Sequence, residues 1–202
     1  MKNKFEEIYS QNQWGNGSGA GSIIKHNKGF ILFLEKFIKE NKISTIVDMG
    51  CGDWQFSSHI NWDGLNYKGY DIVESVITKN QEIYSSKNVS FHCYSGDSSE
   101  LPGADLLVVK DVLQHWSYES INNFFPVFEK FKFILITNCI DPNEEMNNIS
   151  IDDGGFSCLD LRLKPFSLDL EKLFSYTNKK PFWMPAFLFN PSWTKYVLLL
   201  KN

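Results

Sequence analysis

The sequence predicts an α/β fold: a mostly parallel, seven-stranded sheet with helices on both faces, closed by an antiparallel C-terminal hairpin. Two observations indicate this class. From residue 43 to residue 137, short apolar runs of strand length alternate with stretches of helical periodicity, and strands connected through helices form parallel sheets. Two later β-rich runs, 182–189 and 193–200, are separated only by Asn190, Pro191 and Ser192, which is typical of a hairpin.

The individual elements follow from periodicity and from the residues that interrupt it. Apolar side chains at 30, 33, 34, 37 and 38 recur at helical spacing, and the apolar run at 43–48 is typical of a buried strand. The same criteria place helices at 2–12, 24–40, 54–60, 75–86 and 118–128, and strands at 43–48, 66–71, 89–94, 104–110 and 132–137. The polar stretch 138–155 is predicted to be a loop, with the length of a lid or a substrate-contact segment.

Length and composition limit the function classes. With 202 residues and 43% hydrophobic content, the chain is expected to form one globular domain, with N-terminal helices and a glycine-rich lid at 1–42 and a ligand-binding part at 43–202. A formal charge of −4 with a single arginine, Arg162, argues against nucleic acid as a partner. Four scattered cysteines, a polar N-terminus and the lack of a long apolar run favour the cytoplasm and no membrane association.

The most informative stretch is the glycine turn after the first strand, residues 48–53. An apolar strand ends on Asp48 and is followed by Gly50 and Gly52, which let the backbone approach a nucleotide closely. A dinucleotide site needs a third glycine, but that position is Gln55. Asp48 and Asp53 would repel a pyrophosphate, so the turn suits a ligand that carries a cationic amine and a sulfonium.

Further acidic residues follow later strands of the predicted sheet. Asp71 ends the strand at 66–71, where a carboxylate can bind ribose hydroxyls. Asp97 and Ser98 follow the strand at 89–94, where a side chain could hold an adenine amine. Each acid alone is equally well explained as a turn former. Acids at the ends of three successive strands are hard to explain that way.

In this ordered set the chain resembles the class I S-adenosylmethionine-dependent methyltransferases over about residues 43–200. Val47 to Gly52 is similar to their first motif, Tyr70 and Asp71 to the second, Gly96 and Asp97 to the third, and 110–115 to the segment after strand four. The missing third glycine is a departure that leaves the start of the following helix open. The resemblance implies S-adenosyl-L-methionine as cofactor, bound by Trp14, Asp48, Gly50, Cys51, Gly52, Asp71, Ile72, Asp97, Ser98, Lys110 and Asp111.

His115 is the candidate catalytic residue. It lies four residues after Asp111, at the exit of the fourth strand, and histidine is suited to accepting a proton near neutral pH. The same spacing resembles the phosphoethanolamine methyltransferases, in which a tyrosine on an N-terminal lid pairs with the histidine; Tyr9 would be that partner. The alternative is a histidine that packs beside the cofactor without taking a proton.

The remaining candidates concern the acceptor. The segment 14–22, rich in glycine and serine, resembles one found ahead of this domain in some small bacterial members; it is either a flexible linker or a lid on which Trp14 shields the cofactor. His26, Trp116 and Arg162 are acceptor-side candidates alongside Tyr9, with Arg162 able to bind an anion. No residue set has metal-ligand spacing.

Together these features predict a methyltransferase that acts on a small molecule, with an oxygen of a sugar, a glycan precursor or a small phosphorylated metabolite as the acceptor. The alternatives are methylation of nitrogen on a small amine or a nucleic acid, an NAD-binding oxidoreductase, and a non-catalytic partner subunit. The sequence leaves the oligomeric state open.

Overall fold

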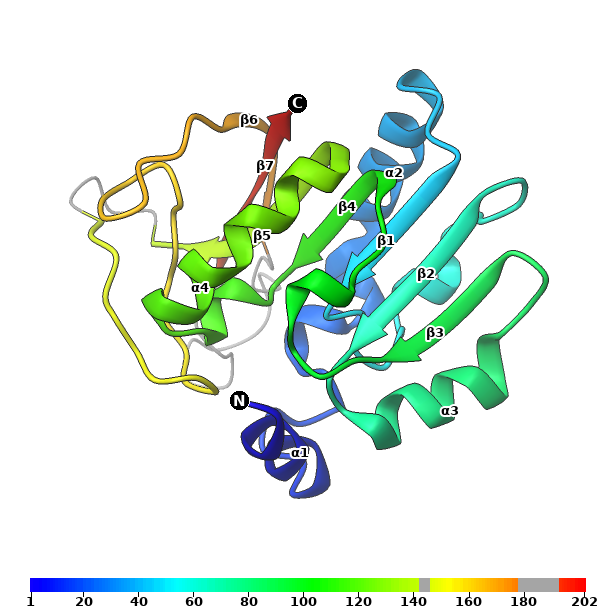
Figure 1. Ribbon diagram of the computed structural model, residues 1–202, viewed down its shortest axis with the longest axis horizontal. Helices are drawn as coiled ribbons and strands as arrows, with labels where there is room; N and C mark the ends of the chain where they lie inside the picture. Colours follow the sequence, from blue (N-terminus) through cyan, green and yellow to red (C-terminus); the bar gives the residue numbers. More distant parts are fainter. Residues whose placement is uncertain (142–145, 178–192) are drawn as a thin grey trace, which may run out of the picture.

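The fold is a seven-stranded sheet in the order β3-β2-β1-β4-β5-β7-β6 (Figure 1). The computed structural model describes residues 1–141, 146–177 and 193–202. The first five strands pair in parallel, and β7 is antiparallel to both β5 and β6. The strands are β1 (Thr45–Met49), β2 (Asn66–Asp71), β3 (Val89–Cys93), β4 (Ala104–Lys110), β5 (Phe131–Ile140), β6 (Glu171–Thr177) and β7 (Thr194–Lys201). The predicted fold class is therefore confirmed.

Helices cover both faces of this sheet because its strands alternate between two cores. In β4, Leu107 and Val109 belong to one core, while Leu106 and Val108 belong to the other, as the two-residue period of a strand requires. Helix α2 (Ile24–Glu40) buries its apolar side chains in the second core; α1 (Lys2–Ser10) and α4 (Tyr118–Phe124) do so in the first. Helix α3 (Glu74–Tyr84) lies beside β3 (Figure 1).

The predicted helix at 54–60 is wrong. The structure has only a 3-10 turn there, Ser57–His59. Trp54 adopts a left-handed conformation with φ of 59°, which an α-helix does not accommodate. Its indole is buried and donates to the Tyr67 hydroxyl at 2.9 Å, so tertiary packing of the ring outweighs local helix propensity.

Other boundaries differ for identifiable reasons. The predicted helix at 118–128 is α4 followed by a 3-10 segment, Phe125–Lys130, with Pro126 in its first turn. Strand β5 extends to Ile140 because β7 pairs with it from Phe133 to Ile140, which lies opposite Thr194. The predicted strand at 182–189 lies outside the described residues. Besides β5, the strand that pairs with β7 is β6, for which the sequence predicts no element.

The order of the strands creates a place for a ligand. The chain runs from β1 outward to β2 and β3, and then returns to place β4 on the other side of β1. In open parallel sheets, ligands bind at the carboxyl ends of the strands where the order reverses in this way. Helix α1 lies near this edge of the sheet (Figure 1).

Candidate cofactor and acceptor site

A cavity of about 520 Å³ lies at this edge, between the carboxyl ends of β1, β2, β4 and β5 and the N-terminal segment. It has the volume expected of a pocket for a small-molecule ligand. Twelve of the predicted site residues line it: Tyr9, Trp14, Asp48, Gly50, Cys51, Gly52, Asp71, Ile72, Lys110, Asp111, His115 and Trp116. Residues from four strand ends and from the first 22 positions are thus gathered around one space.

The glycine turn forms the cavity wall at the end of β1. Gly50 has a φ of 76° and Gly52 a φ of 55°, a region that only glycine adopts without strain. A Cβ at Gly50 would lie 2.3 Å from a methyl carbon of Val112, so a side chain has no space there. The amides of Gly50 and Cys51 both donate to the carbonyl of Tyr70, which holds the turn against β2.

Two buried carboxylates flank the turn. Asp48 accepts a hydrogen bond of 2.6 Å from the Tyr67 hydroxyl, and burial raises its pKa to about 6. Asp71 accepts from the amides of Gly52 and Val73, both at 3.0 Å. Burial also raises the pKa of Asp71, although these amide donors oppose the increase. Both groups are therefore positioned by the fold itself and stay fixed at the strand ends.

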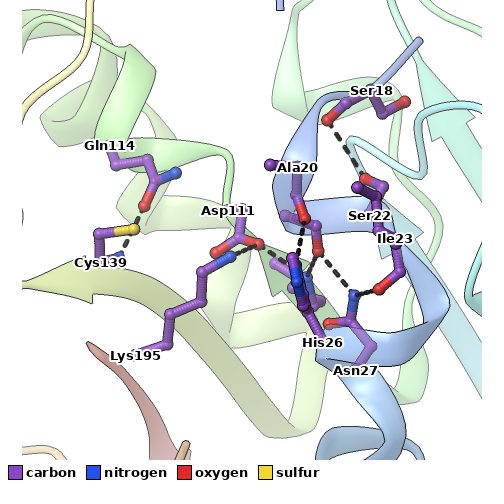
Figure 2. Close-up of polar contacts among 12 residues, drawn as sticks. Ser18, Ala20, Ser22, Ile23, His26, Asn27, Asp111, Gln114, Cys139 and Lys195 are labelled. Carbon is purple, nitrogen blue, oxygen red and sulfur yellow. Dashed lines mark hydrogen bonds and ion pairs between the residues drawn. The ribbon is translucent and has the colours of Figure 1, made fainter. Parts of the chain in front are cut away.

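A cluster of charged side chains lies at the end of β4, where one oxygen of Asp111 accepts from two ammonium groups. Figure 2 shows one of these contacts, from Lys195 to Asp111. Lys110 Nζ lies 2.7 Å from Asp111 Oδ2 and also donates to the Gly21 carbonyl at 3.1 Å. Lys195, from β7, donates to the same Oδ2. Burial lowers the pKa of Lys110 to about 8. Burial alone would raise the pKa of Asp111, but the two ammonium groups bring it below its ordinary value.

His115 has the geometry of a neutral base. Its Nδ1 donates to the Gly155 carbonyl at 2.7 Å, which leaves Nε2 as the nitrogen with the lone pair in the neutral ring. The ring contacts Trp14, with centroids 4.9 Å apart, and Phe156, with centroids 5.6 Å apart. Burial lowers the pKa of His115, opposed by the Gly155 carbonyl and the charge of Asp111, so the ring stays neutral at physiological pH.

The glycine-rich segment, residues 14–22, is docked onto the site by polar contacts. The amide of Ser18 donates to Asp53 Oδ2 at 3.0 Å, and the amide of Asp53 donates to Ser18 Oγ at 2.9 Å. The hydroxyls of Tyr9 and Ser18 are 2.7 Å apart. With the contact from Lys110 to Gly21, these bonds hold the segment over the cavity at Ser18 and at Gly21.

Four predicted site residues do not line the cavity: Asp97, Ser98, His26 and Arg162. Asp97 is exposed and accepts from the Ser99 amide at 2.8 Å, so it caps the short 3-10 turn that begins at Ser98. His26 Nδ1 donates to the Ala20 carbonyl at 3.1 Å (Figure 2). Arg162 forms an ion pair of 2.6 Å with Asp160. Each of these polar groups is used in local structure, a role that strand and turn patterns do not distinguish from ligand binding.

The structure also brings in residues that the sequence analysis missed. Lys195, Gln114 and Phe156 all line the cavity. An isolated lysine in an apolar strand, as Lys195 is, resembles the edge lysines of many sheets, so its spacing gives no signal. Among the described residues no group of three or more His, Cys, Asp or Glu side chains could hold a metal ion. None of the described helices has the length and apolar character needed to cross a membrane.

Comparisons with known proteins agree with this architecture. No family model matches the chain. It is 29% identical over 120 residues to the ubiquinone biosynthesis O-methyltransferase of Hydrogenovibrio crunogenus, which covers 56% of this chain and 48% of that protein. The chain thus spans about half the length of that curated relative.

Solved structures extend the likeness to the whole chain. Magnesium protoporphyrin IX methyltransferase from Synechocystis PCC 6803, determined with bound SAH, superposes with a TM-score of 0.61 at 10% identity over 100% of this chain and 99% of that one. TehB from Haemophilus influenzae gives a TM-score of 0.59 at 17% identity over 86% of this chain and 62% of that one. With a mostly parallel seven-stranded sheet closed by an antiparallel hairpin, this chain has the fold of the Rossmann-like methyltransferases.

Proposed function

We propose that this protein is an S-adenosylmethionine-dependent methyltransferase that methylates an oxygen of a small molecule. The observation that carries the proposal is the convergence of Asp48, Asp71 and Asp111, from three strand ends, on one cavity with His115. Acids predicted separately along the sequence are gathered around a space of ligand size. The methyltransferase fold and the similarity to an O-methyltransferase over 120 residues support the same class.

The charges of the cavity fit a cationic cofactor. Its described lining contains four carboxylates, Asp48, Asp71, Asp111 and Asp141, and two ammonium groups, Lys110 and Lys195. S-adenosylmethionine carries a sulfonium, an ammonium and one carboxylate, so its net positive charge complements this excess of acids. Asp71 would bind the ribose hydroxyls, the glycine turn would face the methionine part, and Trp14 would cover the cofactor.

The same geometry weighs against a dinucleotide. A pyrophosphate needs a helix N-terminus directly after the glycine turn. Here the chain continues through Trp54 in a left-handed conformation into a 3-10 turn of three residues, Ser57–His59. The pyrophosphate of NAD would therefore meet the buried carboxylates of Asp48 and Asp71 without a compensating helix dipole.

His115 would supply the general base. When bound, S-adenosylmethionine supplies an electrophilic methyl carbon. His115 Nε2 would take the proton of the acceptor hydroxyl, and the bond from Nδ1 to the Gly155 carbonyl keeps the ring in the required tautomer. Trp14 and Phe156 both pack against the ring. A positioned base of this kind contributes roughly 10²–10⁴-fold to the rate.

The acceptor would be a small hydroxyl compound; a sugar, a glycan precursor or a small phosphorylated metabolite remains our proposal. Its support is the resemblance of the N-terminal segment together with the size of the cavity, about 520 Å³. Arg162 does not serve as a phosphate anchor in this arrangement, because its guanidinium is paired with Asp160 away from the cavity lining.

Calorimetry with S-adenosylmethionine, SAH and NAD tests the cofactor. We expect binding of the first two and none of NAD, and tight binding of NAD alone would overturn the proposal. His115→Ala tests the base: turnover should fall about 10²-fold or more while SAH affinity is kept. His59→Ala, at an exposed histidine on the 3-10 turn, is the matched control and should leave both unchanged.

A further inference from the structure

Lys195 is a buried charged residue in the cavity wall to which the proposed mechanism so far gives no role. It lies near the start of β7, directly opposite Cys139 of β5 in the sheet register. Its side chain is 2% exposed. The ammonium donates to Asp111 Oδ2 and lies 4.2 Å from the ring centroid of Trp193. Burying a lysine is costly unless the site uses its charge, so this one requires an explanation.

Lys195 belongs to the same wall as His115. Cys139, its neighbour across the sheet, donates its amide to Gln114 Oε1 at 2.7 Å (Figure 2). Gln114 Nε2 in turn lies 3.3 Å from His115 Nε2. The charge of Lys195 acts on the imidazole, as one of the factors that lower the pKa of His115. The ammonium and the proposed base therefore face one region of the cavity.

The positive charge at this end of the cavity is only partly neutralised by Asp111. Its Oδ2 receives both Lys110 and Lys195, and one carboxylate balances one of two ammonium groups. Asp48 acts on Lys110 from the side of β1 and contributes to its pKa. Among the described residues, Lys195 Nζ donates only to Asp111, although an ammonium has three N–H donors. Among these contacts Lys110 uses two of its three N–H donors and Lys195 uses one, so Lys195 has more donors available for a ligand.

We propose that Lys195 Nζ binds the acceptor oxygen of the methyl-transfer reaction, and that the site is therefore built for an oxygen acceptor and not for an amine. This inference rests on the proposed function. The acceptor O–H bond breaks and its proton goes to His115 Nε2. The oxygen forms the new bond to the methyl carbon as the carbon–sulfur bond breaks, and that bonding pair goes to the sulfur. Lys195 stabilises the negative charge that develops on the oxygen.

The electrostatics separate the two acceptor classes. A cation within about 4–6 Å of a hydroxyl lowers the pKa of that hydroxyl, typically by about 1–3 pH units. The same cation repels a protonated amine and gives no help to a neutral one. An oxygen acceptor therefore gains both binding and activation from Lys195, whereas an amine of the same shape gains neither.

The test uses 4-nitrophenol, whose phenolate has a visible absorption band, and 4-nitrobenzylamine as its amine counterpart. Each probe is titrated with pH in the presence of the complex with SAH. We expect the wild-type complex to lower the apparent pKa of bound 4-nitrophenol by about one pH unit or more and to bind the amine poorly. Lys195→Met should abolish the shift and Lys195→Arg should keep part of it. Lys172→Met, an exposed lysine of β6, should leave it unchanged.

The outcomes are separable. An unshifted or raised phenol pKa in the wild-type complex, no binding of the phenolate, or preferred binding of the protonated amine overturns the role of Lys195, whether or not the variants fold. An equal shift in wild type and Lys195→Met does the same, with SAH affinity and thermal unfolding showing that the variant is intact. Failure of the wild-type protein to bind either S-adenosylmethionine or SAH would instead refute the proposed function, and this inference with it.

Discussion

Replacing Gly50 by alanine tests the assignment of the glycine turn, and Gly64 is a closely matched control. The two glycines have φ values of 76° and 75°. An added Cβ at Gly50 would lie 2.3 Å from Val112 Cγ2, whereas one at Gly64 would have nothing within 4 Å. Both substitutions incur about 1–2 kcal/mol for a left-handed alanine, and both restrict the unfolded chain equally. Only Gly50→Ala adds a steric clash, of about 1–3 kcal/mol.

Gly50→Ala should therefore reduce the free energy of unfolding by about 1–3 kcal/mol more than Gly64→Ala does. Urea denaturation followed by tryptophan fluorescence measures both. Val112→Ala removes the methyl groups that clash, so a double-mutant cycle should recover about 1 kcal/mol or more as coupling. Equal destabilisation by the two glycine variants, or additive behaviour of Gly50 with Val112, would refute this account of the turn.

Three further predictions follow from the charges of the site. Because burial lowers the pKa of His115, the base stays neutral to lower pH, and the acid limb of kcat should have an apparent pKa below 6.5; a limb well above that value would exclude His115 as the base. The pKa of Asp48 rises from 3.8 to about 6 on folding, so its contribution to stability is complete below pH 3.8 and lost as pH rises through 6. Relative to Asp48→Asn, wild-type stability should fall across that window by on the order of 3 kcal/mol, measured by urea denaturation against pH. Asp53→Ala removes the acceptor of the Ser18 amide, so proteolysis within residues 14–22 should become faster in the presence of SAH, while Asp63→Ala, an exposed control, should match wild type.

Much of the architecture could be predicted from local pattern. Helix α2 has the bounds that its apolar spacing predicts, Ile24–Glu40, because its buried face recurs every three to four residues. Strands β2 and β4 match their predicted ranges for a similar reason: each is an apolar or alternating run bounded by turn residues. The helix predicted at 54–60 failed because the conformation of Trp54 is set by packing against Tyr67, a partner that is distant in sequence.

For the candidate site, too, local pattern selected some residues that line the cavity and others that do not. Asp48 and Asp71 were predicted because parallel strands present their carboxyl ends at one edge, and Asp111 was predicted from the family resemblance; the structure brings all three to the cavity. Asp97 is also an acid that follows a strand, yet the amide of Ser99 occupies its carboxylate, and the predicted anion-binding residue Arg162 is paired with Asp160. Local sequence does not reveal which acid faces a cavity and which one caps a turn.

The sequence by itself determined the alternation of strands and helices, the glycine turn after β1 and the acids at the strand ends, since each depends on neighbours a few residues away. Only the tertiary structure decided that β6 is the strand that pairs with the outer side of β7 and that the segment 14–22 docks on Asp53. It alone placed Lys195 beside Asp111, across 84 residues of chain. Such contacts between distant segments depend on how the sheet and the N-terminal helices pack, and no period in the sequence encodes them.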